Sequence, residues 1–202
     1  MKHKLFVLMI LTGFSMHLFS QDFEQLINNG IAKADLGNYK EAMVEFHKAL
    51  ELNPKSAIAN NNLGNCLIGM KDVEGSITYY NMAIQFNPKF AKAYYNRGKA
   101  KAELKKYDSA LIDLNKSLEL DPSYFQAYFV RGNIRYSMID FDGAIDDYYT
   151  SIKMSPKYAE AYYNRGGVKL TIGDKEGGCS DFNTSLQLGY KAAEELIDQF
   201  CK

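Results

Sequence analysis

The chain has 202 residues, of which 47% are hydrophobic and 24% charged, a balance typical of a soluble folded protein with a sizeable core. Its 24 basic and 24 acidic side chains cancel, so the composition carries no electrostatic signature of a nucleic-acid or membrane-surface binder. The composition therefore argues against a disordered chain and favours neutral or mixed partners.

Residues 1–20 have the pattern of a secretory signal peptide. Lys2 and Lys4 form a basic start, an apolar run follows from Leu5 to Phe14, and the small residue Ser20 stands where a signal peptidase could cut. About 15 mostly apolar residues are fewer than the ~20 that a spanning helix needs, which favours cleavage over an uncleaved anchor. We expect an exported protein, periplasmic or secreted, with no stable membrane span after signal removal and with envelope association left open.

A period of 34 residues organises the chain after the signal. The only four prolines step by 34, and so do three copies of a motif that reads Ala-Tyr-Tyr-Asn-Arg-Gly at residues 93–98. A fixed period of this length marks a repeat array. We number the 34 positions of a repeat as places 1–34 and set each proline at place 32. The repeats are then 23–56, 57–90, 91–124, 125–158 and 159–192.

Each repeat is predicted to form a helical hairpin. Small residues recur at places 8 and 20, and turn-prone pairs at places 15 and 16, such as Gly37-Asn38, separate two segments rich in helix formers. A large residue at place 24 continues the apolar stripe of the second segment, and proline ends it. Residues 191–202 carry an i, i+4 apolar stripe, which predicts a closing helix.

This pattern resembles the tetratricopeptide repeat (TPR) family. The similarity rests on small residues at places 8, 20 and 27, aromatics at 4 and 17, a large residue at 24 and proline at 32. It covers nearly all of residues 23–192, with departures in the terminal repeats and in repeat 2, where Asn60 stands at place 4. The resemblance implies an all-α, right-handed superhelical solenoid of antiparallel hairpins over residues 21–202, with about five repeats and a capping helix at about 191–202.

Side chains suited to catalysis are scarce. After residue 20, His47 is the only histidine, so a His-based triad has one candidate and a multi-histidine metal site has none. The sequence also has no glycine-rich phosphate loop. We therefore expect no enzymatic activity, no metal and no cofactor.

Arginine at place 7 and aspartate at place 23 occur together in repeats 3, 4 and 5. The two places lie almost level in a hairpin that turns near place 15. We therefore predict an ion pair within each of these repeats, in which the aspartate satisfies a partly buried guanidinium. An arginine ladder for anionic ligands is the alternative. The predicted pairs are Arg97 with Asp113, Arg131 with Asp147, and Arg165 with Asp181.

The resemblance places one stripe of the first helices on the concave side, and we predict a ligand-binding groove there. Amides can donate to and accept from a peptide main chain, and exposed aromatic rings add amphipathic contact area. The alternative is that the repeats merely copy residues on a solvated face. The residues of the predicted groove are Tyr95, Asn96, Lys99, Phe129, Asn133, Tyr163, Asn164 and Asn62.

Cys179 and Cys201 are equidistant from residue 190, the expected turn before the closing helix. An antiparallel pair of helices would bring them level, and an oxidising compartment would let them bond. A bridge over about 22 residues would contribute ~3 kcal/mol in the chain-entropy model. Two buried free thiols are the alternative, and Cys66 is expected in the core.

The sequence thus favours a non-enzymatic protein-interaction scaffold that binds a peptide or protein segment, and no nucleic acid, outside the cytoplasm. A structural subunit of a homo-oligomer or of a cell-envelope complex is the alternative. A glycan-binding protein is a third hypothesis, since tyrosines and asparagines also suit sugars.

Overall fold

The computed structural model describes residues 21–202, so the predicted signal over residues 1–20 lies outside the described residues. In the described part, helices joined by short connections make up the regular structure. Residues 21–35 are helical and precede the labelled helices. These are α2 (Tyr39–Leu52), α3 (Ala57–Gly69), α4 (Val73–Phe86), α5 (Ala91–Glu103), α6 (Tyr107–Leu120), α7 (Phe125–Ser137), α8 (Phe141–Met154), α9 (Ala159–Thr171), α10 (Lys175–Gln187) and α11 (Ala193–Phe200).

The helix boundaries follow the 34-residue period. Helices α3, α5, α7 and α9 begin at place 1 of an expected repeat, and α2, α4, α6, α8 and α10 begin at place 17. The predicted all-α class and the pairing of helices into hairpins are confirmed. Among the helices of residues 21–202, none combines the length and the apolarity that crossing a bilayer requires.

The turn inside every repeat has the same backbone geometry. The residue at place 15 has a positive φ, between 58° and 89°, in all five repeats. Glycine supplies this conformation at Gly37 and Gly173, whereas a side chain with a Cβ pays a steric penalty there. The remaining three residues at place 15 are Lys71, Lys105 and Ile139.

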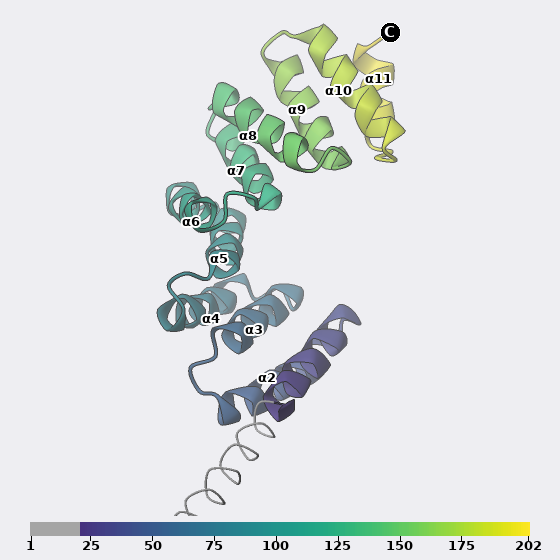
Figure 1. Ribbon diagram of the computed structural model, residues 1–202. Coiled ribbons are helices and arrows are strands. Elements are labelled where there is room, and N and C mark those ends of the chain that lie inside the picture. The colour runs from purple at the N-terminus through teal and green to yellow at the C-terminus, as the bar shows by residue number, and fades with distance from the viewer. Residues whose placement is uncertain (1–20) are drawn as a thin grey trace, which may run out of the picture. The chain divides into compact units, whose positions relative to one another are not determined.

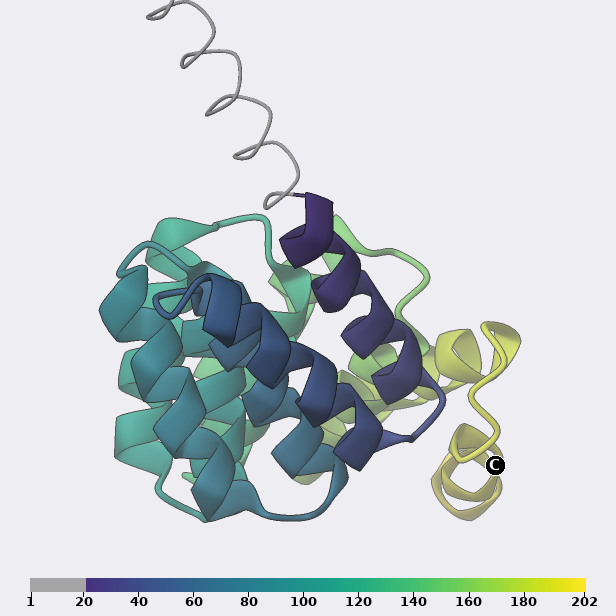
Figure 2. The same ribbon diagram turned by 90° about the horizontal axis from the view of Figure 1, so that it is seen from below.

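Residues 21–100 and 101–202 belong to two compact units, and α5 runs across the boundary between them. In the first unit, α3 packs against both α2 and α4. In the second unit, α7 packs on α6 and α8, and α9 packs on α8 and α10. The last helix, α11, packs on α10. The hairpins are visible as adjacent helices in Figure 1, and α11 closes the C-terminal end beside α10 (Figure 1 and Figure 2).

Glycine at place 8 allows the two helices of a hairpin to approach closely. A Cβ at this position would lie 2.5–2.9 Å from the ring at place 24, which is shorter than a tolerable carbon contact. The ring therefore packs directly on the backbone of the first helix, and the core of each unit forms around such rings. The pairs are Gly30 with Phe46, Gly64 with Tyr80, Gly132 with Tyr148, and Gly166 with Phe182.

Candidate functional site

A pocket of about 370 Å³ opens in the second unit. Asn133 and Tyr136 of α7, Tyr163 and Asn164 of α9, and Leu196 of the closing helix α11 are among the residues that line it. Three of them, Asn133, Tyr163 and Asn164, belong to the predicted groove. The lining contains no Lys, Arg, Asp or Glu, so the pocket offers aromatic, aliphatic and amide surface without a formal charge.

The two asparagines of the pocket are joined through one oxygen atom. Asn133 Oδ1 accepts a hydrogen bond from the Tyr148 hydroxyl at 2.7 Å and another from Asn164 Nδ2 at 2.8 Å. Burial raises the pKa of Tyr148, so its hydroxyl stays protonated and keeps donating. Asn133 Nδ2 and Asn164 Oδ1 take no part in these two bonds, and together they match the acceptor and donor of a peptide group.

The first unit contains the same arrangement two repeats earlier. Asn65 Oδ1 accepts from the Tyr80 hydroxyl at 2.9 Å and from Asn96 Nδ2 at 3.1 Å, and Asn96 Nδ2 also lies 2.8 Å from Asn61 Oδ1. Burial raises the pKa of Tyr80 as well. Amides of successive first helices are therefore fixed in orientation by a buried tyrosine beneath them.

Sequence reasoning missed Asn65 and the two tyrosines, although the sequence contained a signal for them. In repeats 2 and 4, asparagine at place 9 coincides with tyrosine at place 24. Repeats 1 and 5 have Phe at place 24 together with Ile31 or Gly167 at place 9, neither of which can accept a bond through its side chain. A hydroxyl thus occurs at place 24 where a side-chain acceptor is present at place 9.

The three aromatic rings at place 5 are half-buried, whereas we expected them to be exposed. The Phe129 ring lies 4.8 Å from that of Tyr158, and the Tyr163 ring lies 5.0 Å from that of Tyr190, measured between centroids. Burial also raises the pKa of Tyr95. The Phe129 and Tyr163 rings are thus partly covered by residues that follow in the chain, which leaves less of each ring for a ligand.

The other predicted groove residues lie apart from this pocket. Asn62 lines a separate pocket of about 290 Å³ in the first unit, where Asp35 and Lys92 add charge to the lining. Lys99 is exposed on α5 and lines neither of these two pockets. The predicted set is therefore divided between sites of different chemistry.

The arginines at place 7 in the second unit make bidentate ion pairs within their repeats. Arg131 Nη2 and Nε lie 2.6 and 2.9 Å from the two oxygens of Asp147, and the carboxylate is 2% exposed. Arg165 binds Asp181 in the same way at 2.7 and 2.8 Å. Each guanidinium also lies over the tyrosine at place 4 of its own helix, 5.4–5.6 Å from the ring centroid.

A second cation at place 11, which sequence reasoning missed, joins the same carboxylates. Arg135 Nη1 lies 3.1 Å from Asp147, and Lys169 Nζ lies 2.9 Å from Asp181. The sequence has a cation at place 11 wherever place 23 is acidic, and repeat 2, with Leu67 there, has no acid at place 23. The remaining two contacts of this kind are Lys101 with Asp113 at 2.8 Å and Lys33 with Glu45 at 2.6 Å.

Arg97 belongs to the first unit, where it donates to Asn81 Oδ1 at 2.7 Å and lies over the Tyr94 ring. Asp113 belongs to the second unit and binds Lys101. The pairing of Arg97 with Asp113 stays a prediction. In repeat 1 the hydrogen bond from Lys33 lowers the pKa of Glu45, because it stabilises the ionised carboxylate.

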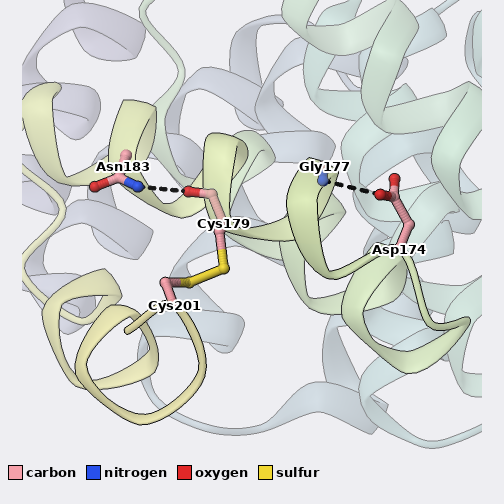
Figure 3. Close-up of a disulfide and its surroundings, with 5 residues drawn as sticks. All are labelled: Asp174, Gly177, Cys179, Asn183 and Cys201. Atoms are coloured by element: carbon pink, nitrogen blue, oxygen red, sulfur yellow. Dashed lines mark hydrogen bonds between the residues drawn. A yellow bond between two sulfur atoms is a disulfide. The ribbon is translucent and has the colours of Figure 1, made fainter.

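Cys179 of α10 and Cys201, directly after α11, are bonded to each other, with their Cα atoms 5.6 Å apart (Figure 3). The bridge fastens α11, and with it the pocket residue Leu196, to the last repeat. Asp174 caps the start of α10 by accepting from the Gly177 N–H. Cys66 is buried, and burial raises the pKa of its thiol to about 11, which disfavours the reactive thiolate form.

Hairpins of 34 residues, with small residues at the helix crossings and prolines between repeats, define a helical-repeat protein. The tetratricopeptide repeat model matches residues 91–124, and a second model, described as TPR repeat, matches residues 30–70, 67–105 and 132–173. These matches cover more than half of the chain, which therefore belongs to the tetratricopeptide repeat family.

Solved structures that share the fold include PilF, MamA and YrrB. PilF of Pseudomonas aeruginosa has a TM-score of 0.80 and 19% identity, over 85% of this chain and 78% of that one. MamA has a TM-score of 0.71 and 24% identity, over 82% of this chain and 96% of that one. YrrB, described as a TPR protein with an unusual peptide-binding site, has a TM-score of 0.69 and 19% identity, over 89% of this chain and 97% of that one. At these identities the likeness shows the fold, and it confirms the predicted TPR solenoid class; no curated protein matches the sequence.

Proposed function

We propose that this protein is a non-enzymatic scaffold that binds an extended peptide or protein segment at the first-helix face of its repeats, outside the cytoplasm. The observation that carries the proposal is the amide pair of Asn133 and Asn164, held by Tyr148 at the edge of an uncharged pocket. A preformed donor and acceptor avoid the entropy cost of ordering side chains on binding. The site is therefore suited to a peptide main chain.

The chemistry of the described residues supports binding without catalysis. His47, the sole histidine among residues 21–202, is exposed and contacts the Tyr79 ring edge-on at 6.4 Å between centroids. Over the same residues, no cluster of three or more His, Cys, Asp or Glu side chains could hold a metal ion. The near-neutral charge of the chain favours a protein or peptide over a nucleic acid.

Two further observations support the class of partner and the compartment. YrrB, which shares the fold, is described as having a peptide-binding site, so the hairpin array is compatible with such a ligand. Disulfides persist in oxidising compartments, so the Cys179–Cys201 bridge favours a location outside the cytoplasm. The basic and apolar pattern of residues 1–20 favours the same location.

The test is the selection of peptides from a random displayed library on the purified protein, followed by titration of the enriched peptides. Asn164→Ala removes one pocket amide while Tyr148 still satisfies Asn133 Oδ1, so the variant should fold and lose affinity. Asn183→Ala is the matched control, since Asn183 is an exposed asparagine of α10 that bonds only within its own helix among the contacts described. Failure to enrich any peptide, or equal binding by both variants, would contradict the proposal.

Assembly with copies of itself is the second candidate function. Large apolar side chains are exposed on second helices, including Val44 of α2 (52%), Ile112 of α6 (69%) and Tyr149 of α8 (57%). Such side chains contribute to subunit contacts when they form a continuous patch. Sedimentation over a range of concentrations separates the two functions, because a scaffold stays monomeric and a structural subunit associates.

A further inference from the structure

Gly167 is a glycine that packing does not explain. It lies inside α9, where glycine costs conformational entropy relative to alanine. Its neighbour Gly166 has a clear structural reason, because a Cβ there would meet the Phe182 ring at 2.9 Å and the Gly178 carbonyl oxygen at 3.0 Å. A Cβ at Gly167 would meet nothing within 4 Å.

The space that Gly167 leaves is part of the pocket in the second unit. Gly167 lines this pocket beside Asn164 and Tyr163 of the same helix. Place 9 of the other four repeats holds a larger side chain, and those are Ile31, Asn65, Lys99 and Asn133. A side chain of that size at position 167 would project into the pocket, so the missing side chain leaves this part of the pocket open.

The lining determines what can occupy this space. Tyr136 and Tyr163 provide aromatic surface, and Leu196 provides aliphatic surface. A charged side chain entering the pocket would lose hydration without meeting an opposite charge, which is unfavourable. A bulky apolar side chain would instead replace water against apolar carbon.

We propose that this pocket binds one bulky apolar side chain of an extended peptide, for which Gly167 makes room. The Asn133 and Asn164 amides hold the main chain of the peptide beside that side chain. The proposal rests on the proposed peptide-binding function and adds the chemistry of the bound residue. Leu196 completes the pocket only while α11 stays in place.

The test compares Gly167→Leu with Gly167→Ala in titrations of a fluorescently labelled peptide enriched from the random library. Both variants replace a helix-interior glycine at an open position, so both should keep or raise the thermal midpoint. Gly167→Leu fills the pocket and should weaken binding about 10- to 100-fold, the range expected from losing the burial of one apolar side chain. Gly167→Ala adds a single methyl group and should bind within a few-fold of the wild type.

A peptide-side experiment gives the same information without changing the protein. Replacing the bulky apolar residue of the enriched peptide by Asp should abolish binding, and replacing it by Ala should weaken it as much as Gly167→Leu does. Equal affinity of wild type and Gly167→Leu, with Asn164→Ala still defective, would overturn the pocket proposal and leave the proposed function standing. If the library yields no binding peptide, the proposed function fails, and the pocket proposal fails with it.

Discussion

The buried carboxylate of Asp147 is predicted to be among the most important polar groups for stability in the second unit. It is 2% exposed and receives two bonds from Arg131 and one from Arg135. Asp147→Ala would leave Arg131 without a carboxylate partner and Arg135 with only its longer contact to Asp140, at 3.6 Å. Removing one partner of a buried ion pair costs about 3–5 kcal/mol. We expect the lower end, about 3 kcal/mol, because the two arginine side chains are 16% and 29% exposed and regain some hydration.

Urea denaturation followed by far-ultraviolet circular dichroism measures this loss. Asp146→Ala is the matched control, because the neighbouring aspartate is exposed and a surface charge contributes about 0–1 kcal/mol. Replacing Asp147, Arg131 and Arg135 together by apolar residues of similar size should recover most of the stability, since no buried charge is then left unpaired. Equal losses of unfolding free energy in Asp147→Ala and Asp146→Ala would refute the structural role of this cluster. A large loss of peptide affinity in a folded Asp147→Ala variant would point to ligand binding instead.

Three further predictions concern pH, backbone strain and the disulfide. The hydrogen bond from Lys33 holds the pKa of Glu45 below its ordinary value of 4.5. The ionised carboxylate therefore stabilises the fold fully above pH 4.5, and this contribution is lost as the pH falls through the lowered pKa. In Glu45→Gln, the unfolding free energy should fall less steeply on the acid side of pH 4.5. Ile139 is a β-branched residue at a φ of 66° and is 74% exposed, so Ile139→Gly should stabilise the protein by about 0.5–1 kcal/mol in urea denaturation. Replacing Cys179 and Cys201 by Ser should lower the unfolding free energy by ~3 kcal/mol and weaken peptide binding, because the short helix α11 then loses its covalent attachment.

Each of these has a clear contrary result. Parallel pH profiles for wild type and Glu45→Gln would show that Lys33 does not hold the carboxylate in the folded state. A lower urea midpoint for Ile139→Gly would mean that the entropy of glycine outweighs the relieved strain. Unchanged peptide affinity in the cysteine double variant would show that Leu196 is held in the pocket without the bridge.

The hairpins could be predicted from the sequence because every repeat carries the same signals at the same places. Glycine at place 8, a ring at place 24 and proline at place 32 determine which helix faces meet, and each of these contacts is local to one repeat. The Arg131–Asp147 contact follows from the same level placement in one hairpin. The resemblance to the TPR family predicted the solenoid class, and the comparison with solved structures confirmed it.

The candidate site was less predictable because it depends on contacts between repeats. Phe129 and Tyr163 looked exposed on a single helix, but Tyr158 and Tyr190 of the following connections cover part of each ring. The pocket is open at Gly167, where a Cβ would meet nothing within 4 Å, and no pattern in the sequence marked this glycine as a site residue. Residues of α9 and α11 line it together, and a single repeat does not contain both helices.

Photo-crosslinking tests the central claim most directly. A peptide from the library selection, synthesised with a benzophenone amino acid in place of its bulky apolar residue, is irradiated with the purified protein and the attachment sites are mapped by mass spectrometry. Binding in the pocket predicts attachment to α9 near Gly167 or to α11 near Leu196, and much less attachment at the same peptide concentration in the Gly167→Leu variant. Attachment to the exposed faces of the second helices α8 and α10 would contradict the account.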